Sequence, residues 1–258
     1  MTRMAAVQMV SAPEVPANLE AAGRLIASAA AAGAKLVALP ENFYIIGRDE
    51  RDKVRAKEAD GSGPVQDFLA ASAKRNRVWI VGGTAPISCE DEGRIRSACL
   101  VFDDAGKRVA RYDKMNLFRF RQGAENYDEA RTIERGTRAV ALDSPFGRLG
   151  LSICYDVRFP ELYRGLGEVD VIFVPSAFTV PTGAAHWETL LRARAIENQA
   201  YVVAPAQGGT HASGRRTYGH TMIVDPWGEV LGVQPEGEGV VLAEIDLEHS
   251  RQLRRRFA

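Results

Sequence analysis

The stretch Leu149-Gly150-Leu151-Ser152-Ile153-Cys154-Tyr155-Asp156 indicates both the class of fold and the place of a site. Its first five residues form a short apolar run, preceded by a turn signal, as is typical of a buried strand. A thiol and a carboxylate follow the run directly. In open α/β sheets ligands bind beyond the carboxyl ends of the strands, so reactive side chains at such a point are candidates for a functional site.

Two other runs end in the same way. Leu36-Val37-Ala38-Leu39 leads through one proline to Glu41, and the run 108–112 leads within two residues to Lys114. Each residue alone is weak evidence, because a cysteine after a strand is more often a small core residue. A carboxylate, an ammonium and a thiol at three strand ends together predict a site. Lysine is also scarce, with six residues against 27 arginines.

The remaining chain alternates helical and strand-like segments. Helices are expected over 15–32, 64–76 and 186–198, and turns between strands at 103–106, 144–147 and 225–228. The charged stretch 119–138 has no clear period and is expected to be a long loop with a short helical piece. Helix–strand alternation with several hairpins predicts an α/β fold with a mixed sheet, or two sheets, covered by helices.

Composition excludes several classes of protein. The 258 residues are 46% hydrophobic and 26% charged, which is unlike a disordered or fibrous chain and suits one domain over residues 1–258. The 33 basic residues balance 33 acidic ones, so no nucleic-acid partner is expected. No apolar run approaches the roughly 18–20 residues of a membrane helix. Three cysteines without a CxxC pair, and an N-terminus unlike a signal peptide, predict a cytoplasmic protein.

The three strand-end residues suit nucleophilic acyl transfer. A thiol attacks a carbonyl as the thiolate, so it needs a base or a lowered pKa. The four histidines are poorly placed for this, which leaves Glu41 as the base. Reference pKa values of roughly 4.3 and 8.5 make that transfer about 6 kcal/mol uphill, and we expect burial of the carboxylate and a neighbouring ammonium to close much of the gap. Lys114 and the backbone N–H of Tyr155 would stabilise the oxyanion, without metal or cofactor.

Three motifs carry a resemblance to a known family. Leu-Pro-Glu-Asn-Phe (39–43), Tyr-Asp-Lys-Met-Asn-Leu-Phe (112–118) and Ser-Ile-Cys-Tyr-Asp-Val-Arg-Phe-Pro-Glu-Leu (152–162) resemble the nitrilase superfamily of carbon–nitrogen hydrolases. The resemblance covers nearly the whole chain. It implies a four-layer α-β-β-α sandwich, a homodimer or higher homo-oligomer, and a triad of Glu41 as general base, Lys114 as oxyanion stabiliser and Cys154 as nucleophile.

A fourth site residue is also implied by the resemblance. The family has a second glutamate between the lysine and cysteine motifs, and it falls on Glu129, where it would position Lys114 and the substrate. Glu125, Asp128 and Glu134 are close rivals for this position in the same charged stretch.

The segments 175–178, 186–197, 206–211 and 218–228 resemble the amidase branch of the family more than true nitrilases. They imply hydrolysis of deaminated glutathione to α-ketoglutarate and Cys-Gly. The alternatives are an ω-amidase acting on α-ketoglutaramate, a nitrilase acting on nitriles, and a catalytically silent binding protein with the same fold. The implied partner is therefore a small amide substrate.

Several residues after strand ends are candidates for contact with that substrate. Arg158 can bind a substrate carboxylate through a bidentate fork, or it can form an ion pair with Asp156, Glu161 or Glu129. Loop residues that either line a pocket or pack in the interior complete the set: Phe43, Tyr44, Asn116, Phe178 and Thr179.

Overall fold

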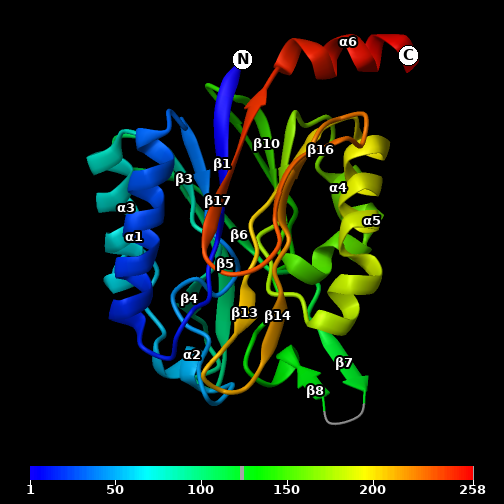
Figure 1. The fold of residues 1–258 in the computed structure, drawn as a ribbon. Helices are drawn as coiled ribbons and strands as arrows, with labels where there is room; N and C mark the ends of the chain where they lie inside the picture. The colour runs from blue at the N-terminus through cyan, green and yellow to red at the C-terminus, as the bar shows by residue number, and fades with distance from the viewer. Residues whose placement is uncertain (123–124, 258) are drawn as a thin grey trace.

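Two large β-sheets lie face to face in the computed structural model, which describes residues 1–122 and 125–257. Helices cover the outer face of each sheet, so the layers run α-β-β-α (Figure 1). This confirms the mixed α/β class and the four-layer sandwich expected from the sequence.

The first sheet has seven strands in the order β17-β1-β2-β3-β5-β4, with β6 paired to β5. Strands β1, β2 and β3 are parallel to one another, and the remaining pairs are antiparallel. The strands are β1 (Thr2–Gln8), β2 (Leu36–Ala38), β3 (Trp79–Val81), β4 (Ala85–Ser88), β5 (Ile95–Phe102), β6 (Arg108–Asp113) and β17 (Gly239–Ile245).

The second sheet has six strands in the order β16-β15-β12-β11-β10-β9, of which β10, β11 and β12 are parallel. Its strands are β9 (Val140–Ser144), β10 (Gly147–Leu151), β11 (Val171–Phe173), β12 (Tyr201–Ala204), β15 (Thr221–Val224) and β16 (Val230–Gln234). Two small antiparallel ribbons complete the strands: β7 (Arg119–Gln122) with β8 (Glu125–Asp128), and β13 (Gly208–Thr210) with β14 (Arg216–Tyr218).

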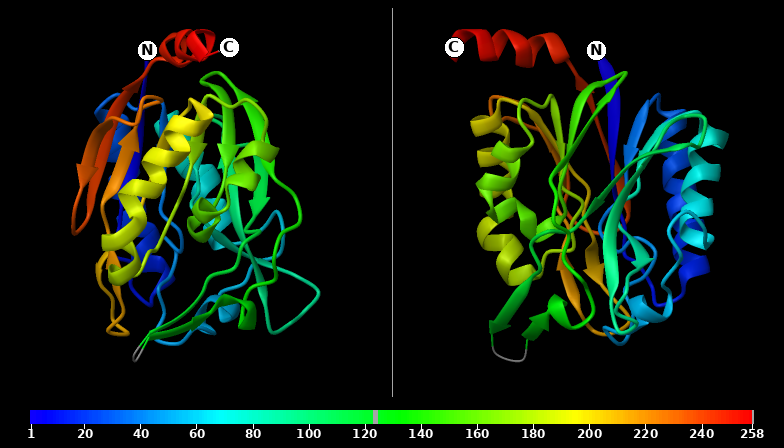
Figure 2. Two further views of the ribbon diagram at one scale, coloured as in Figure 1. Left: turned by 90° about the vertical axis from the view of Figure 1, so that its right-hand side faces the viewer. Right: turned by 180° about the vertical axis from the view of Figure 1, so that it is seen from behind.

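Helices α1 and α3 cover the first sheet, and α4 and α5 cover the second, whereas α6 leads away from the sandwich (Figures 1 and 2). The α-helices are α1 (Val15–Ala31), α2 (Asp52–Arg55), α3 (Pro64–Asn76), α4 (Pro160–Gly165), α5 (Val180–Asn198) and α6 (Leu247–Phe257). Two 3₁₀ turns, η1 (Glu129–Arg131) and η2 (Cys154–Arg158), lie near the strand ends. None of the described helices is long and apolar enough to span a membrane.

Strand β1 shows how the sequence divides the core between the layers. Successive side chains of a strand point to opposite faces. Met4 and Ala6 belong to the cluster shared with the second sheet, whereas Ala5 and Val7 pack with the residues of α1 and α3. All four are fully buried. A central strand that is apolar on both faces therefore lies between a helix layer and a sheet.

Two expectations about elements need correction. The stretch 119–138 contains the short helical piece η1, as expected, but also the ribbon β7–β8, which its charged composition hides. Helix α5 begins at Val180, six residues before the expected start, with Thr179 as its N-cap and Pro181 in its first turn. Proline is well accommodated there because the first N–H groups of a helix need no intrahelical acceptor.

Candidate active site

The three strand-end residues come from different sheets and meet at one end of the sandwich. Glu41 follows β2 and Lys114 follows β6, both in the first sheet, while Cys154 follows β10 in the second sheet and opens η2. All three side chains are buried: Glu41 is 2% exposed, Lys114 0% and Cys154 6%. The packing of the two sheets therefore brings the charged pair and the thiol into one interior site.

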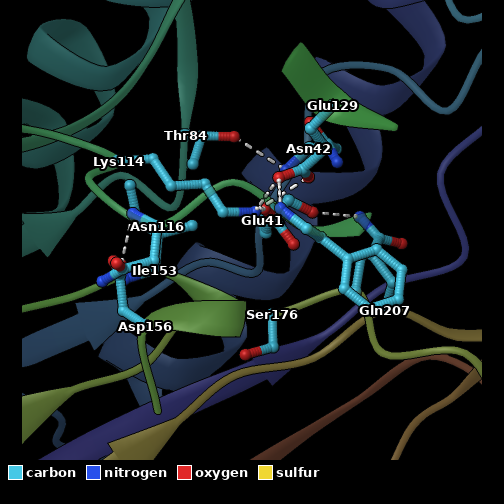
Figure 3. Close-up of polar contacts among 12 residues, drawn as sticks. Glu41, Asn42, Thr84, Lys114, Asn116, Glu129, Ile153, Asp156, Ser176 and Gln207 are labelled. Atoms are coloured by element: carbon cyan, nitrogen blue, oxygen red, sulfur yellow. Dashed lines mark hydrogen bonds and ion pairs between the residues drawn. The ribbon is translucent and has the colours of Figure 1, made fainter. Parts of the chain in front are cut away.

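Lys114 links two carboxylates. Its Nζ donates to Glu41 Oε1 at 2.8 Å and to Glu129 Oε1 at 2.8 Å (Figure 3). The two carboxylates together hold the pKa of the Lys114 ammonium well above its usual value, although burial, the largest single influence, opposes them. Charge-assisted hydrogen bonds of this kind fix the position of the ammonium group.

Among the rival acidic residues, Glu129 is the one in contact with Lys114. Its other oxygen accepts the Phe118 N–H at 2.7 Å. Burial raises the pKa of Glu129, but Lys114 and the hydrogen bonds outweigh burial and lower it overall. Asp128 instead pairs with Arg119, and Glu134 pairs with Arg96. The side chain of Glu125 lies outside the described residues.

Cys154 has an unusual backbone conformation. Its φ is 52°, in the left-handed region that non-glycine residues seldom adopt. Its N–H donates to Pro175 O at 2.9 Å, and this bond to the segment after β11 helps hold the strained turn. Strain of this kind costs about 1–3 kcal/mol and persists where the surroundings impose it, often at functional sites.

The thiol is neutral at rest, contrary to part of the expectation from the sequence. Burial, followed by the charge of Glu41, raises the pKa of the Cys154 thiol well above its usual value, and Lys114 offsets this only in part. The charge count of the site acts in the same direction as burial. Glu41, Lys114 and Glu129 together carry one net negative charge, so a thiolate beside them would add a second. The proton must therefore leave the thiol as the new bond forms.

Asp156 ties the lysine motif to the cysteine motif. Its carboxylate accepts the Tyr112 hydroxyl at 2.7 Å, the Ile153 N–H at 2.8 Å and the Asn116 side-chain amide at 2.9 Å. Figure 3 shows Asn116 directed at this carboxylate. Burial raises the pKa of Asp156 despite these bonds. The bonds join the end of β6 to the turn that carries Cys154, so the two sheets keep a constant relative position at the site.

A small cavity borders the thiol. Its volume is about 10 Å³, close to the least space that holds one water molecule. Of the expected substrate-contact residues, Arg158, Phe178 and Thr179 line it, together with Tyr155. Residues that the sequence interpretation did not single out also line it: Phe118, Ala177, Thr182 and Arg215.

The other expected contact residues lie elsewhere. Phe43 and Tyr44 are fully buried in the core under α1 and α3, where Phe43 packs against Phe68. Asn116 is bound to Asp156 and does not line the thiol cavity. A loop position after a strand end therefore did not distinguish a pocket residue from a packing residue.

Arg158 forms none of the expected ion pairs within the described part of the chain. Its Nη2 lies 3.2 Å from Nδ1 of His186, and its guanidinium lies 5.8 Å from the ring centre of Tyr155 and 5.6 Å from that of Phe178. These contacts hold the cation at the wall of the thiol cavity. His186 is thus a neighbour of the site, within α5.

A larger cavity of about 960 Å³ adjoins the first. Phe118, Glu129 and Arg215 line both cavities, so the two are neighbours at these side chains. Lys53 of α2 lines the larger one. Neither Lys53 nor Arg215 stands in a motif that singles it out, and arginine is common throughout the chain, so the sequence carried no signal for them.

Among residues 1–122 and 125–257, no group of three or more histidine, cysteine, aspartate or glutamate side chains is arranged to hold a metal ion. The buried carboxylates Glu41 and Glu129 instead have Lys114 as their common cation.

Comparisons with known proteins agree with this geometry. The model of the carbon–nitrogen hydrolase family matches residues 3–255. A curated relative, deaminated glutathione amidase of Synechocystis, is 44% identical over 98% of this chain and 94% of its own. The crystal structure of yeast Nit3, of branch 10 of the nitrilase superfamily, superposes with a TM-score of 0.87 at 30% identity, covering 99% of this chain and 93% of that one.

A third similarity is to a fusion protein. The Caenorhabditis elegans NitFhit structure has a TM-score of 0.87 at 37% identity and covers 99% of this chain, which spans 63% of the NitFhit chain. The match of the family model over almost the whole chain, the sandwich fold and the identity to curated relatives lead to one conclusion. This chain is a member of the carbon–nitrogen hydrolase family, within the nitrilase superfamily.

Proposed function

We propose that this protein is a thiol amidase that hydrolyses deaminated glutathione to α-ketoglutarate and Cys-Gly. The observation that carries the proposal is the buried Glu41–Lys114–Glu129 cluster next to the Cys154 thiol. A silent binding protein has no chemical need for an ammonium and two carboxylates buried around a thiol. The name of the Synechocystis relative supports the choice of substrate.

The neutral Cys154 thiol and the charges of Glu41 and Lys114 determine how acylation proceeds. Cys154 Sγ attacks the amide carbonyl carbon while Glu41 accepts the thiol proton, so no free thiolate accumulates. The carbonyl oxygen becomes an oxyanion, which Lys114 stabilises together with the Tyr155 N–H. Tyr155 lies in the first turn of η2, where N–H groups need no intrahelical acceptor. Glu41 then returns the proton to the leaving nitrogen, the carbon–nitrogen bond breaks, and a thioester remains on Cys154.

Deacylation repeats the sequence with water. Glu41 removes a proton from a water molecule that attacks the thioester carbonyl, and the same two donors stabilise the second oxyanion. Collapse expels the Cys154 sulfur, which regains the proton from Glu41. The product, α-ketoglutarate, then leaves the site with its new carboxylate. Glu129 takes no part in proton transfer but keeps Lys114 in place.

Release of α-ketoglutarate from deaminated glutathione and from α-ketoglutaramate, measured side by side, tests the proposal. Cys154→Ala is the control, because it removes the nucleophile and leaves the buried charges unchanged. A higher kcat/KM for deaminated glutathione supports the proposal, and a higher value for α-ketoglutaramate favours an ω-amidase. Full turnover by Cys154→Ala would refute the thioester mechanism. A silent protein would hydrolyse neither amide.

Location and assembly are further parts of the proposal. The three free cysteines, of which Cys99 and Cys154 are buried, support a reducing compartment such as the cytoplasm.

Trp227 and Phe257 are 64% and 67% exposed, with ring centres 6.3 Å apart, and such an apolar pair supports association of subunits. Sedimentation equilibrium with Trp227→Ser as the variant tests the homodimer, which a monomeric wild type would refute.

A further inference from the structure

Two cations that form no ion pair with a described carboxylate face the larger cavity. Lys53 and Arg215 both line it and are half-buried. Within the described part of the chain, Lys53 makes no hydrogen bond or ion pair, and Nε of Arg215 is buried without a partner. Nη2 of Arg215 donates to Ala177 O at 2.9 Å, and the guanidinium lies 5.1 Å from the ring centre of Tyr127. Half-buried cations are usually paired, so this pair is unusual.

The two side chains are also close enough to influence each other. Burial is the largest influence on the Lys53 ammonium and lowers its pKa; Glu129 opposes burial, and the charge of Arg215 lowers the pKa further. Glu50 and Asp49 stand exposed at the rim of the cavity, where water screens their charges. Like charges held near each other in partly dry surroundings favour an anion between them.

The charge balance of the site gives the pair a role. Glu41, Lys114 and Glu129 sum to one negative charge, which would repel a carboxylate on the substrate. Lys53 and Arg215 together reverse that sign. Arg215 lines both cavities, whereas Lys53 lines only the larger one. A carboxylate on the substrate is therefore attracted towards these two cations and repelled by the Glu41–Lys114–Glu129 cluster.

We propose that Lys53 and Arg215 form a subsite for the carboxylate of the acyl half of the substrate, with the amide carbonyl at Cys154. This deepens the proposed function and rests on it, because deaminated glutathione and α-ketoglutaramate share the same acyl half and its carboxylate. The thiol cavity, at about 10 Å³, has no space for that half, whereas the adjoining cavity has about 960 Å³. The subsite would select anionic amides over neutral ones.

Arg158 is a weaker candidate for the same role. Its guanidinium already contacts His186 and two aromatic rings. It also does not line the larger cavity. The arrangement of the elements supports this choice, since α2, β14 and the ribbon β7–β8 all gather at the same end of the molecule (Figure 1).

Protection of Cys154 against alkylation tests the subsite without requiring turnover. The probe ligands are glutaramate, which has an amide at one end and a carboxylate at the other, and glutaramide, which has an amide at both ends. The rate of iodoacetamide labelling of the Cys154 peptide is followed by mass spectrometry at increasing ligand concentration. Each rate is divided by the rate of the same variant without ligand, so a changed thiol pKa does not enter the result.

Glutaramate should protect the wild type at a concentration at least about tenfold lower than glutaramide, since only its carboxylate forms charge-assisted hydrogen bonds with the two cations. Lys53→Met and Arg215→Gln should each raise the half-protecting concentration of glutaramate about tenfold and leave that of glutaramide unchanged. Arg216→Gln is the matched control, because Arg216 lines the same cavity with an exposed side chain. It should change protection less than about twofold.

Equal protection by the two ligands would overturn the subsite, as would equal effects of Arg215→Gln and Arg216→Gln. Circular dichroism of each variant shows that a loss of protection is not a loss of fold, and Lys53→Arg should retain most of the protection. The two proposals can fail separately. Selective protection by glutaramate without hydrolysis of either proposed amide would refute the amidase and keep the subsite. Hydrolysis of the proposed amides with an unchanged KM in Lys53→Met and Arg215→Gln would refute the subsite and keep the amidase.

Discussion

Lys114→Met tests the buried charge cluster most directly. The change removes the cation bonded to both Glu41 and Glu129, each at 2.8 Å from Nζ, and keeps a side chain of similar length. Removing one partner of a buried ion pair costs about 3–5 kcal/mol, because the remaining charge stays uncompensated. At pH 8 we expect the free energy of unfolding to fall by that amount.

The pH dependence of this loss follows from the sign of the pKa changes. In the wild type the pKa of Glu129 is lowered, so its contribution is constant between pH 5 and 8 and is lost only in more acidic solution. Without Lys114, the two carboxylates repel each other, and one pKa rises above its unfolded value. The variant should therefore lose less stability at pH 5 than at pH 8, by on the order of 1–2 kcal/mol, because the raised pKa lets that carboxyl bind a proton in the folded protein at pH 5.

Urea unfolding at pH 5 and pH 8 measures both effects. Lys57→Met is the matched control, because Lys57 pairs with Glu92, which is 87% exposed, and should cost less than about 1 kcal/mol. The double variant Lys114→Met/Glu129→Gln restores a single negative charge and should recover more than about 1 kcal/mol at pH 8. A Lys114→Met loss equal to that of the control, with no dependence on pH, would refute the buried charge cluster.

Three further predictions concern the same site. Glu129→Gln removes a charge that raises the pKa of the Cys154 thiol, so iodoacetamide should label Cys154 about 3–10-fold faster at pH 7.5. In the same variant kcat/KM should fall about tenfold or more because Lys114 loses one anchor, and unchanged turnover would contradict that role. Cys99 is fully buried in the core, where burial raises its pKa to about 12, whereas Cys154 borders the thiol cavity, so peptide mass spectrometry should show far slower labelling of Cys99 in the folded wild type. EDTA should leave kcat/KM unchanged, since the proposed mechanism uses no metal, and a loss restored by added metal would argue against it.

The elements that the sequence predicted best have strong local signals. Helix α3 runs over Pro64–Asn76 as expected, since a proline suits its first turn and its apolar residues repeat at helical spacing. Helix α1 ends at Ala31, one residue before the expected end, and Gly33 follows with a φ of 91°. The ribbon β7–β8 was missed because each of its four-residue strands has a single apolar residue, Phe120 or Tyr127, which is too few to show a period.

For the site as well, the sequence predicted some residues correctly and missed others. Glu41, Lys114 and Cys154 could be identified because each comes within three residues of a strand end, and sheet packing brings such ends together. Phe43 and Tyr44 follow a strand as well, yet the turn after β2 directs them into the core under α1. The positions of the cations at the larger cavity depend on how distant segments meet, which spacing along the chain does not encode.

The origin of the site in two sheets has a consequence during folding. Glu41 and Lys114 belong to one sheet and Cys154 to the other, with Asp156 bridging them. A folding intermediate with only one sheet formed would hold either the base or the nucleophile, never both. Such a species would have no assembled hydrolytic machinery to act on the amide bonds of other cellular metabolites. The protein is therefore catalytically competent only after the two sheets have packed together. Recovery of activity during refolding reports that packing.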